Sequence, residues 1–147
     1  MVDLTEQDLL TGLLHGSAFG RRIDLLLPHA AELGEAVAVI VAELPPSADD
    51  GALIDAARRV RDVIRSRDLV ARTGTGEVAV CCPGASEPEA RAVARRIAEA
   101  LAQPFEVAGE LSCLRVGVGL FLRERVHPDD SAGFLLLAAR AMIDDPA

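Results

Sequence analysis

The sequence predicts an α+β domain, an α/β sandwich in which a central, mostly antiparallel sheet is flanked by helices. Segments with apolar residues at helical spacing alternate along the chain with short apolar runs that are typical of buried strands. Two of these runs flank a turn that contains glycine, which indicates a β-hairpin and therefore antiparallel pairing. No repeat or long linker divides the 147 residues, so we expect one domain over residues 1–147.

Four segments carry helix signals. The predicted helices begin with Ser17, with Ser47, with Ser86 and near Asp130. The first should run to about Leu33, with Pro28 favouring a kink or an early end. The second and third starts resemble capping boxes, Ser47-x-x-Asp50 and Ser86-x-x-Glu89, in which a side chain at each end satisfies a backbone N–H. Helices are therefore expected before the first apolar run, between the first run and the hairpin, after the hairpin, and after the last run.

The apolar runs give the strands. We expect strands at residues 36–44, 69–72, 78–82, 105–107 and 114–122, with residues 73–77 forming the hairpin turn. Cys81 and Cys82 are adjacent, so on a strand they would point to opposite faces of the sheet. Neither they nor Cys113 have metal-site spacing. All three are predicted to be buried, small apolar residues in a reducing cytoplasm.

Composition excludes several classes of function. The formal net charge of −8 argues against a nonspecific nucleic-acid binder and against a basic membrane-surface protein. All 15 basic residues are arginine, so no lysine is present for a Schiff base or a P-loop. Aromatic residues make up only 3% of the chain, which disfavours a base-stacking platform. The acidic start of the chain does not resemble a targeting signal, and no apolar run is long enough to span a bilayer, so we expect a cytoplasmic protein.

Catalytic patterns are sparse, whereas arginines are concentrated near one helix end. His15, His29 and His127 are isolated, so the sequence predicts no catalytic residue, no metal site and no cofactor. The segment Arg65-Ser66-Arg67-Asp68 falls at the end of the second helix. A guanidinium can bind phosphate through two N–H groups and stack on a purine, while a carboxylate can accept from a guanine edge. A solvated helix face with a local Arg–Asp pair explains the same residues.

Three motifs, in order, carry a family resemblance. They are Asp8-Leu9-Leu10-Thr11-Gly12-Leu13-Leu14-His15 with Phe19, Arg65-x-x-Asp68-Leu69-Val70-Ala71-Arg72, and Gly74-Thr75-Gly76-Glu77-Val78. They resemble the D-x-L-T-G-L-x-N…F opening, the R-x-x-D-x-x-A-R stretch and the G-G-[DE]-E-F signature of the GGDEF domain of bacterial diguanylate cyclases. The resemblance covers nearly the whole chain and implies a nucleotide-cyclase-like fold.

The sequence departs from the family pattern at the positions that bind metal ions and nucleotide in the family. The resemblance places the vestigial active-site positions at Glu43, Asp50, Gly74, Thr75, Gly76 and Glu77. Family members hold metal ions with a carboxylate after the first long strand, where only Glu43 is present, and with the third signature residue, which here is Gly76. The guanine-reading segment before Asp49 looks deleted, and the phosphate-binding lysines are missing. These losses imply a degenerate domain without diguanylate cyclase activity.

The resemblance also implies a retained regulatory site. In active members, R-x-x-D binds cyclic di-GMP as the inhibitory product, and a later arginine completes the site. Here Arg65, Asp68 and Arg96 match these positions, so cyclic di-GMP is the expected partner. As a helix-end surface residue, Arg65 is expected to cost little stability when it is replaced by alanine.

Two alternatives remain open. The first is a docking or dimerisation module that binds another signalling protein, or itself, and no nucleotide. The second is a residual enzyme that uses Glu43 and Glu77 around one metal ion. Neither alternative involves nucleic acid or a membrane.

Overall fold

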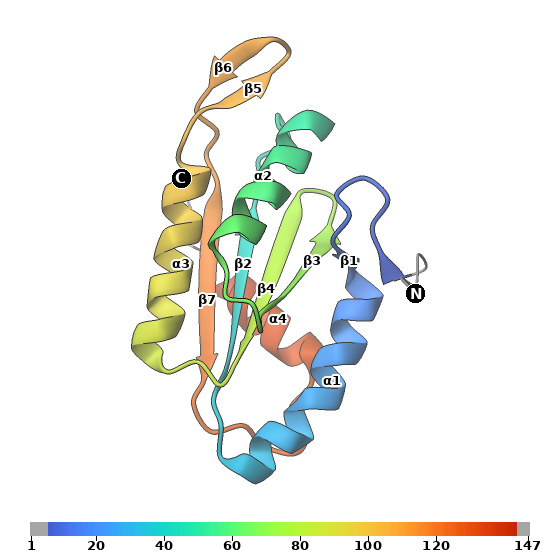
Figure 1. The fold of residues 1–147 in the computed structure, drawn as a ribbon, viewed down its shortest axis with the longest axis vertical. Coiled ribbons are helices and arrows are strands. Elements are labelled where there is room, and N and C mark those ends of the chain that lie inside the picture. The colour runs from blue at the N-terminus through green and yellow to red at the C-terminus, as the bar shows by residue number, and fades with distance from the viewer. Residues whose placement is uncertain (1–5, 144–147) are drawn as a thin grey trace.

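The computed structural model describes residues 6–143, which form two sheets and four helices (Figure 1). The helices are α1 (Gly16–Leu33), α2 (Asp50–Val63), α3 (Glu87–Leu101) and α4 (Ala132–Ala141). The strands are β1 (Leu14–His15), β2 (Val37–Glu43), β3 (Leu69–Gly74), β4 (Glu77–Pro83), β5 (Phe105–Val107), β6 (Glu110–Ser112) and β7 (Gly117–Arg123). Within the described residues, no helix combines the length and the apolar character needed to cross a membrane.

The main sheet has five strands in the order β1-β3-β4-β2-β7, and only the short β1 pairs in parallel. The hairpin of β3 and β4 turns at Thr75 and Gly76, as the sequence predicts. Strand β2 lies between β4 and β7 and is antiparallel to both. This register places Glu43 opposite Glu77 on one side and opposite Gly117 on the other. The ends of three strands therefore meet at one side of the sheet.

Both faces of the sheet are covered, which confirms the predicted sandwich. Alternate residues of β2 enter different cores: Ala38, Ile40 and Ala42 face α2 and α3, while Val37, Val39 and Val41 face α1 and α4. Figure 1 shows α2 and α3 in front of the sheet and α4 behind it. The continuous apolar run of β2 follows from this position, because a strand covered on both faces buries every side chain.

Two of the predicted helix caps are wrong. The N-cap of α1 is His15, whose Nδ1 accepts from the backbone N–H of Ala18 at 3.1 Å, and Ser17 lies inside the first turn. Pairing of His15 in β1 keeps the chain extended up to this residue, so the helix starts earlier than the serine suggests. The N-cap of α2 is Asp49 rather than Ser47; its Oδ1 accepts from Ala52 N–H at 2.8 Å. The Ser86 capping box is confirmed.

A second, two-stranded sheet projects beyond the main one (Figure 1). Its strand β5 was expected, but the sequence analysis did not predict β6, whose three residues are all exposed. Cys113 follows β6 and is exposed, so the prediction that it is buried is wrong. Cys81 and Cys82 are buried on opposite faces, as predicted. Burial raises the pKa of the Cys81 thiol to about 12, which keeps it protonated at neutral pH.

Candidate functional site

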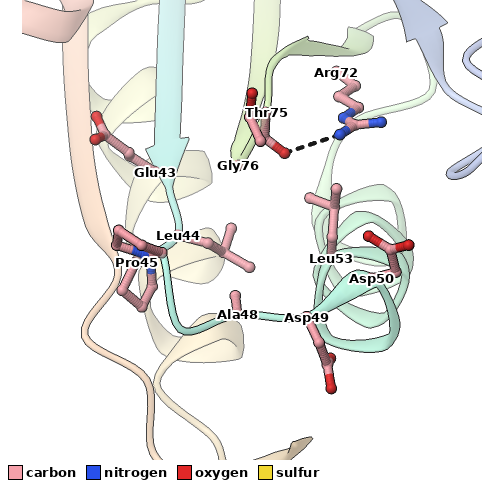
Figure 2. A pocket seen from close by; sticks show the side chains of 11 residues that line it. Glu43, Leu44, Pro45, Ala48, Asp49, Asp50, Leu53, Arg72, Thr75 and Gly76 are labelled. Carbon is pink, nitrogen blue, oxygen red and sulfur yellow. Dashed lines mark hydrogen bonds between the residues drawn. The ribbon is translucent and has the colours of Figure 1, made fainter.

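A pocket of about 270 Å³ lies where β2 ends and the hairpin turn begins (Figure 2). Its apolar lining is Leu44, Pro45, Pro46, Ala48 and Leu53, and its polar lining is Glu43, Asp49, Asp50, Arg72 and Thr75. Figure 2 shows Leu44 and Leu53 directed into the pocket, whereas Glu43 is turned away from its centre. The pocket contains four of the predicted vestigial positions, namely Glu43, Asp50, Thr75 and Gly76. Its interior is therefore mainly apolar, and its carboxylates lie at the rim.

The third position of the hairpin signature lies directly against the chain that follows β2. The carbonyl of Gly76 accepts from Leu44 N–H at 2.8 Å. A Cβ atom added at Gly76 would lie 3.2 Å from the carbonyl oxygen of Leu44, which is tighter than ordinary contact. Gly76 provides no side-chain oxygen, and the backbone packing leaves little room for one. Glu43 is thus the one carboxylate at the adjoining end of β2.

Glu77, the next residue, is held on the other side by an ion pair. Arg140 of α4 donates from Nε and Nη2 to its two carboxylate oxygens at 2.8 and 2.7 Å, and Thr73 Oγ1 donates at 2.7 Å. Burial favours a higher pKa for Glu77, but these donors outweigh burial and hold the pKa below its usual value. Glu77 does not line the pocket. Its carboxylate therefore fastens the hairpin to α4 rather than facing the cavity.

Arg72 is the cation of the pocket, and each of its three guanidinium nitrogens makes one hydrogen bond within the protein. Its Nη1 donates to Asp8 Oδ1 at 3.2 Å, and its Nε and Nη2 donate to the carbonyls of Gly74 and Thr75 at 3.2 and 3.0 Å. Burial tends to raise the pKa of Asp8, but bonds from Thr11 and from Arg72 lower it overall. In the sequence, Arg72 is recognisable only as part of a motif, and its place in the pocket was not predicted. Its approach to the turn depends on pairing between distant segments.

Arg65 and Asp68 form a second candidate site between α2 and β3. Arg65 donates from Nε and Nη2 to Asp68 Oδ1 at 3.0 and 2.8 Å, and Nη2 also donates to the Pro83 carbonyl at 3.1 Å. The Asp68 side chain is 0% exposed and also accepts from Arg65 N–H. The remaining nitrogen, Nη1, has only a long contact of 3.5 Å with Glu89. Asp68 therefore positions Arg65 and would reach a ligand only after the arginine moved.

Arg96 is exposed on α3, seven residues after Glu89. This separation is about 10 Å along the helix axis. In the described part of the chain, no hydrogen bond or ion pair joins Arg96 to Arg65 or Asp68. The structure thus brings two of the three predicted residues together and leaves the third nearby on a neighbouring helix.

The ion pair also corrects the expectation that Arg65 is a simple surface residue. Its side chain is only 21% exposed and it neutralises a carboxylate that has no contact with solvent. Removal of one partner of such a pair leaves an uncompensated buried charge. Replacement of Arg65 by alanine is therefore expected to destabilise the fold, contrary to the prediction made from its place at a helix end.

Comparison with known proteins identifies the fold and its family. The sequence profile of the diguanylate cyclase GGDEF domain matches residues 47–144. This chain belongs to the GGDEF family. This GGDEF domain is 31% identical over 149 residues to diguanylate cyclase TpbB of Pseudomonas aeruginosa and 29% identical over 150 residues to an uncharacterized signaling protein of Caulobacter vibrioides. The match to TpbB covers 92% of this chain and 34% of TpbB. The match to the Caulobacter protein covers 94% of this chain and 18% of that protein.

Solved structures match over nearly the whole GGDEF domain. A sensory box/GGDEF family protein from Caulobacter crescentus is 28% identical, with a TM-score of 0.78, and the match covers 94% of this chain and 95% of that one. The FimX GGDEF domain from Pseudomonas aeruginosa is 20% identical, with a TM-score of 0.81 and coverage of 93% and 90%. The GGDEF domain of DgcB from Caulobacter crescentus, solved in complex with c-di-GMP, is 19% identical, with a TM-score of 0.79 and coverage of 96% and 89%. These matches confirm the predicted nucleotide-cyclase-like fold.

The residues of this GGDEF domain do not fit the metal ions that the family uses. Gly76 offers no ligand atom, and Glu77 is bound by Arg140. Within residues 6–143, no group of three or more His, Cys, Asp or Glu side chains is arranged to hold a metal ion. Of the two carboxylates that the family resemblance assigns to metal ions, Glu43 is present and Gly76 has no side-chain oxygen, so a Mg²⁺ ion would depend on Glu43, substrate phosphates and water.

Proposed function

We propose that this GGDEF domain is a catalytically inactive signalling domain that binds cyclic di-GMP through Arg65, Asp68 and Arg96. The observation that carries the proposal is the contrast between its two candidate sites. The pocket beside the signature hairpin lacks a metal-binding carboxylate at Gly76, and each guanidinium nitrogen of its one arginine, Arg72, already donates to the protein. The Arg65 site keeps a positioned guanidinium with one weakly bound nitrogen.

The loss of cyclase activity is supported by charge. A nucleoside triphosphate needs cations for its phosphates, and metal ions usually supply them. In the pocket, Arg72 is neutralised by Asp8, and the other charged lining residues are Glu43, Asp49 and Asp50. An anionic ligand would therefore meet net negative charge. This electrostatic balance opposes GTP binding and leaves the developing charge of a phosphoryl transfer unstabilised.

Binding of cyclic di-GMP is supported by the chemistry around Arg65. Nη1 of Arg65 can donate to a phosphate if Glu89, whose side chain is 55% exposed, moves aside. Exposed Arg96 can stack on a purine or contact the second phosphate. The DgcB domain, which shares this fold, was solved with the same ligand. In this proposal, the role of Asp68 is to orient Arg65.

Calorimetric titration with cyclic di-GMP tests this function. Arg96→Ala is the main variant, because Arg96 is exposed and its loss should leave the fold intact; Arg95→Ala, also exposed, is the matched control. We expect micromolar binding by wild type and by the control, and at least tenfold weaker binding by Arg96→Ala, a difference of about 1.4 kcal/mol. Equal affinity in all three proteins, or no binding by the folded wild type, would reject the site.

Incubation with GTP and Mg²⁺ or Mn²⁺ tests catalytic inactivity separately. We expect no cyclic dinucleotide by mass spectrometry, even at high protein concentration. Sustained product formation would show that Glu43 and Glu77 support a residual enzyme, and would overturn this half of the proposal while leaving the binding result unaffected.

A protein-interaction module is the second candidate, because α4 has an exposed apolar stripe. Phe134 and Leu137, three residues apart on α4, are 44% and 67% exposed, and Met142, the C-cap that follows the helix, is 56% exposed. The related cyclase SiaD was solved in complex with its activator SiaC. This function predicts no nucleotide binding and a partner that co-purifies with wild type but is lost from Leu137→Glu. Leu9→Glu, at a site that is 92% exposed, is the control.

A further inference from the structure

The two edges of the main sheet differ in a way that concerns assembly. One edge is β1, which has two residues. The other is β7, which has seven residues and pairs with β2 in an unbroken register. Soluble proteins usually protect a long edge with lysine, proline or a β-bulge, because its free N–H and C=O groups pair readily with another strand. Strand β7 has none of these protections.

The apolar side chains of β7 remain partly exposed although helices cover both faces of the sheet. Strands β2 and β4 bury nearly every residue, whereas six of the seven residues of β7 are only half-buried. Val118, Leu120 and Leu122 are among these residues and pack toward the core that α2 and α3 cover. Because α3 and α4 both contact β7, the exposed surface lies along its outer edge. The edge is therefore both unpaired among the described residues and apolar.

A groove of about 230 Å³ lies at the start of this edge on the α3 side, and Arg115 is the charged residue of its lining. Its lining includes Ala98 and Leu101 of α3, Leu114 and Val116 of the segment before β7, and Val118. A strand added beside β7 would place alternate side chains over this groove, because side chains alternate between the two faces of a strand. An added strand with apolar residues at every second position would therefore fill it.

We propose that a second copy of this chain pairs at this edge, β7 against β7 in antiparallel orientation across a two-fold axis. The strand itself carries the pattern that the groove requires, since Val118, Leu120 and Leu122 share one face. With Leu120 opposite Leu120 of the second copy, all seven residues pair and Val118 meets Leu122. The contact is the same surface on both copies, as a two-fold interface requires. The two five-stranded sheets become one continuous sheet.

Charge is compatible with this register. Arg123 is the one charged residue of β7, and it falls opposite Gly117 of the second copy rather than opposite another charge. Its guanidinium is already neutralised by Asp130, with Nε to Oδ2 at 2.8 Å. Within β7, like charges therefore do not meet across the axis, whereas just beyond the strand the same register brings Arg115 opposite Arg125 of the second copy. The residues proposed to bind cyclic di-GMP, Arg65, Asp68 and Arg96, lie outside β7, so the pairing is independent of that binding.

Sedimentation equilibrium of the nucleotide-free protein tests the pairing. We expect the wild-type mass to rise from 15.5 kDa toward twice that value as concentration approaches about 100 µM, a range that detects micromolar association. Leu120→Lys should remain monomeric, because it places a like charge on the axis. Leu111→Lys, on the 79% exposed hairpin residue, is the control and should dimerise as wild type does. A monomeric wild type at the highest concentration would overturn the proposal.

Cross-linking gives an answer that does not depend on the lysine variant folding. In a Cys113→Ser background, Leu120→Cys should form an intermolecular disulfide, because opposite residues of antiparallel strands lie about 4.5–5.5 Å apart between Cα atoms, within disulfide range. Leu111→Cys in the same background is the control and should cross-link at least tenfold more slowly. Equal rates for the two positions would refute pairing in this register.

Discussion

Replacement of Arg65 by alanine tests whether the Arg65–Asp68 pair is a structural element as well as a binding one. The substitution removes two charge-assisted bonds to Asp68 and one bond to the Pro83 carbonyl. It leaves a carboxylate with 0% exposure that keeps the backbone N–H of residue 65 and the buried Cys82 thiol as its donors. Breaking a buried pair costs about 3–5 kcal/mol. Because Arg65 itself is 21% exposed, water can partly replace it, and we expect a loss of about 3 kcal/mol in the free energy of unfolding.

Urea denaturation followed by circular dichroism measures this loss, and thermal melting should show a fall of about 6–12 °C for a domain of this size. Arg96→Ala is the control and should stay within about 0.5 kcal/mol of wild type, as exposed substitutions usually do. Asp68→Ala removes the stranded carboxylate, so the double variant should lose less than the sum of the single variants. The reasoning fails if Arg65→Ala and Arg96→Ala unfold at the same denaturant concentration.

Three further substitutions test the packing around the site. Arg59 donates to three carbonyl oxygens in the last turn of α3 and just after it, and its guanidinium stacks on a buried phenylalanine ring at 3.9 Å. Arg59→Met should therefore lower the free energy of unfolding by about 2–3 kcal/mol in a urea titration. The pKa of Glu77 in the folded protein is below 4.5, its usual value. The carboxylate therefore stabilises the fold fully above pH 4.5, and this stability is lost as the pH falls through the folded pKa. In thermal melts, Glu77→Gln should lose less stability than wild type between pH 6 and pH 3.5. A Cβ at Gly119 would overlap α4, so Gly119→Ala should cost about 2–3 kcal/mol, whereas Gly133→Ala inside α4 should stabilise slightly; similar melting temperatures for the two variants would contradict this packing.

Local signals predicted the regular elements well. The β2 run, the Ser86 capping box and the β3–β4 turn are confirmed because each depends on neighbours within a few residues. The two failed caps, at Ser17 and Ser47, occur where a better acceptor lay close by. At the first, pairing between β1 and β3 decided where the helix begins, and no local pattern reports such pairing.

The candidate site was only partly visible in the sequence. The family motifs indicated Arg65 and Asp68, and the structure places them in contact. They did not show that Asp68 is fully buried, since burial depends on how the segments around β3 pack. Nor did they reveal that Arg140 binds Glu77 across 63 positions of the chain. A carboxylate that appears available in a motif can thus be engaged by a distant residue.

The sequence by itself determined the family, the sandwich fold and the absence of a ligand atom at Gly76, because these depend on residue identity, local spacing and periodicity. Only the tertiary structure decided that Arg72 is neutralised by Asp8 and that β7 forms an unprotected edge. The physical reason is the same in both cases. Ion pairing and strand order join segments that are far apart in the chain, and their free energies depend on distances and burial that local sequence patterns do not reveal.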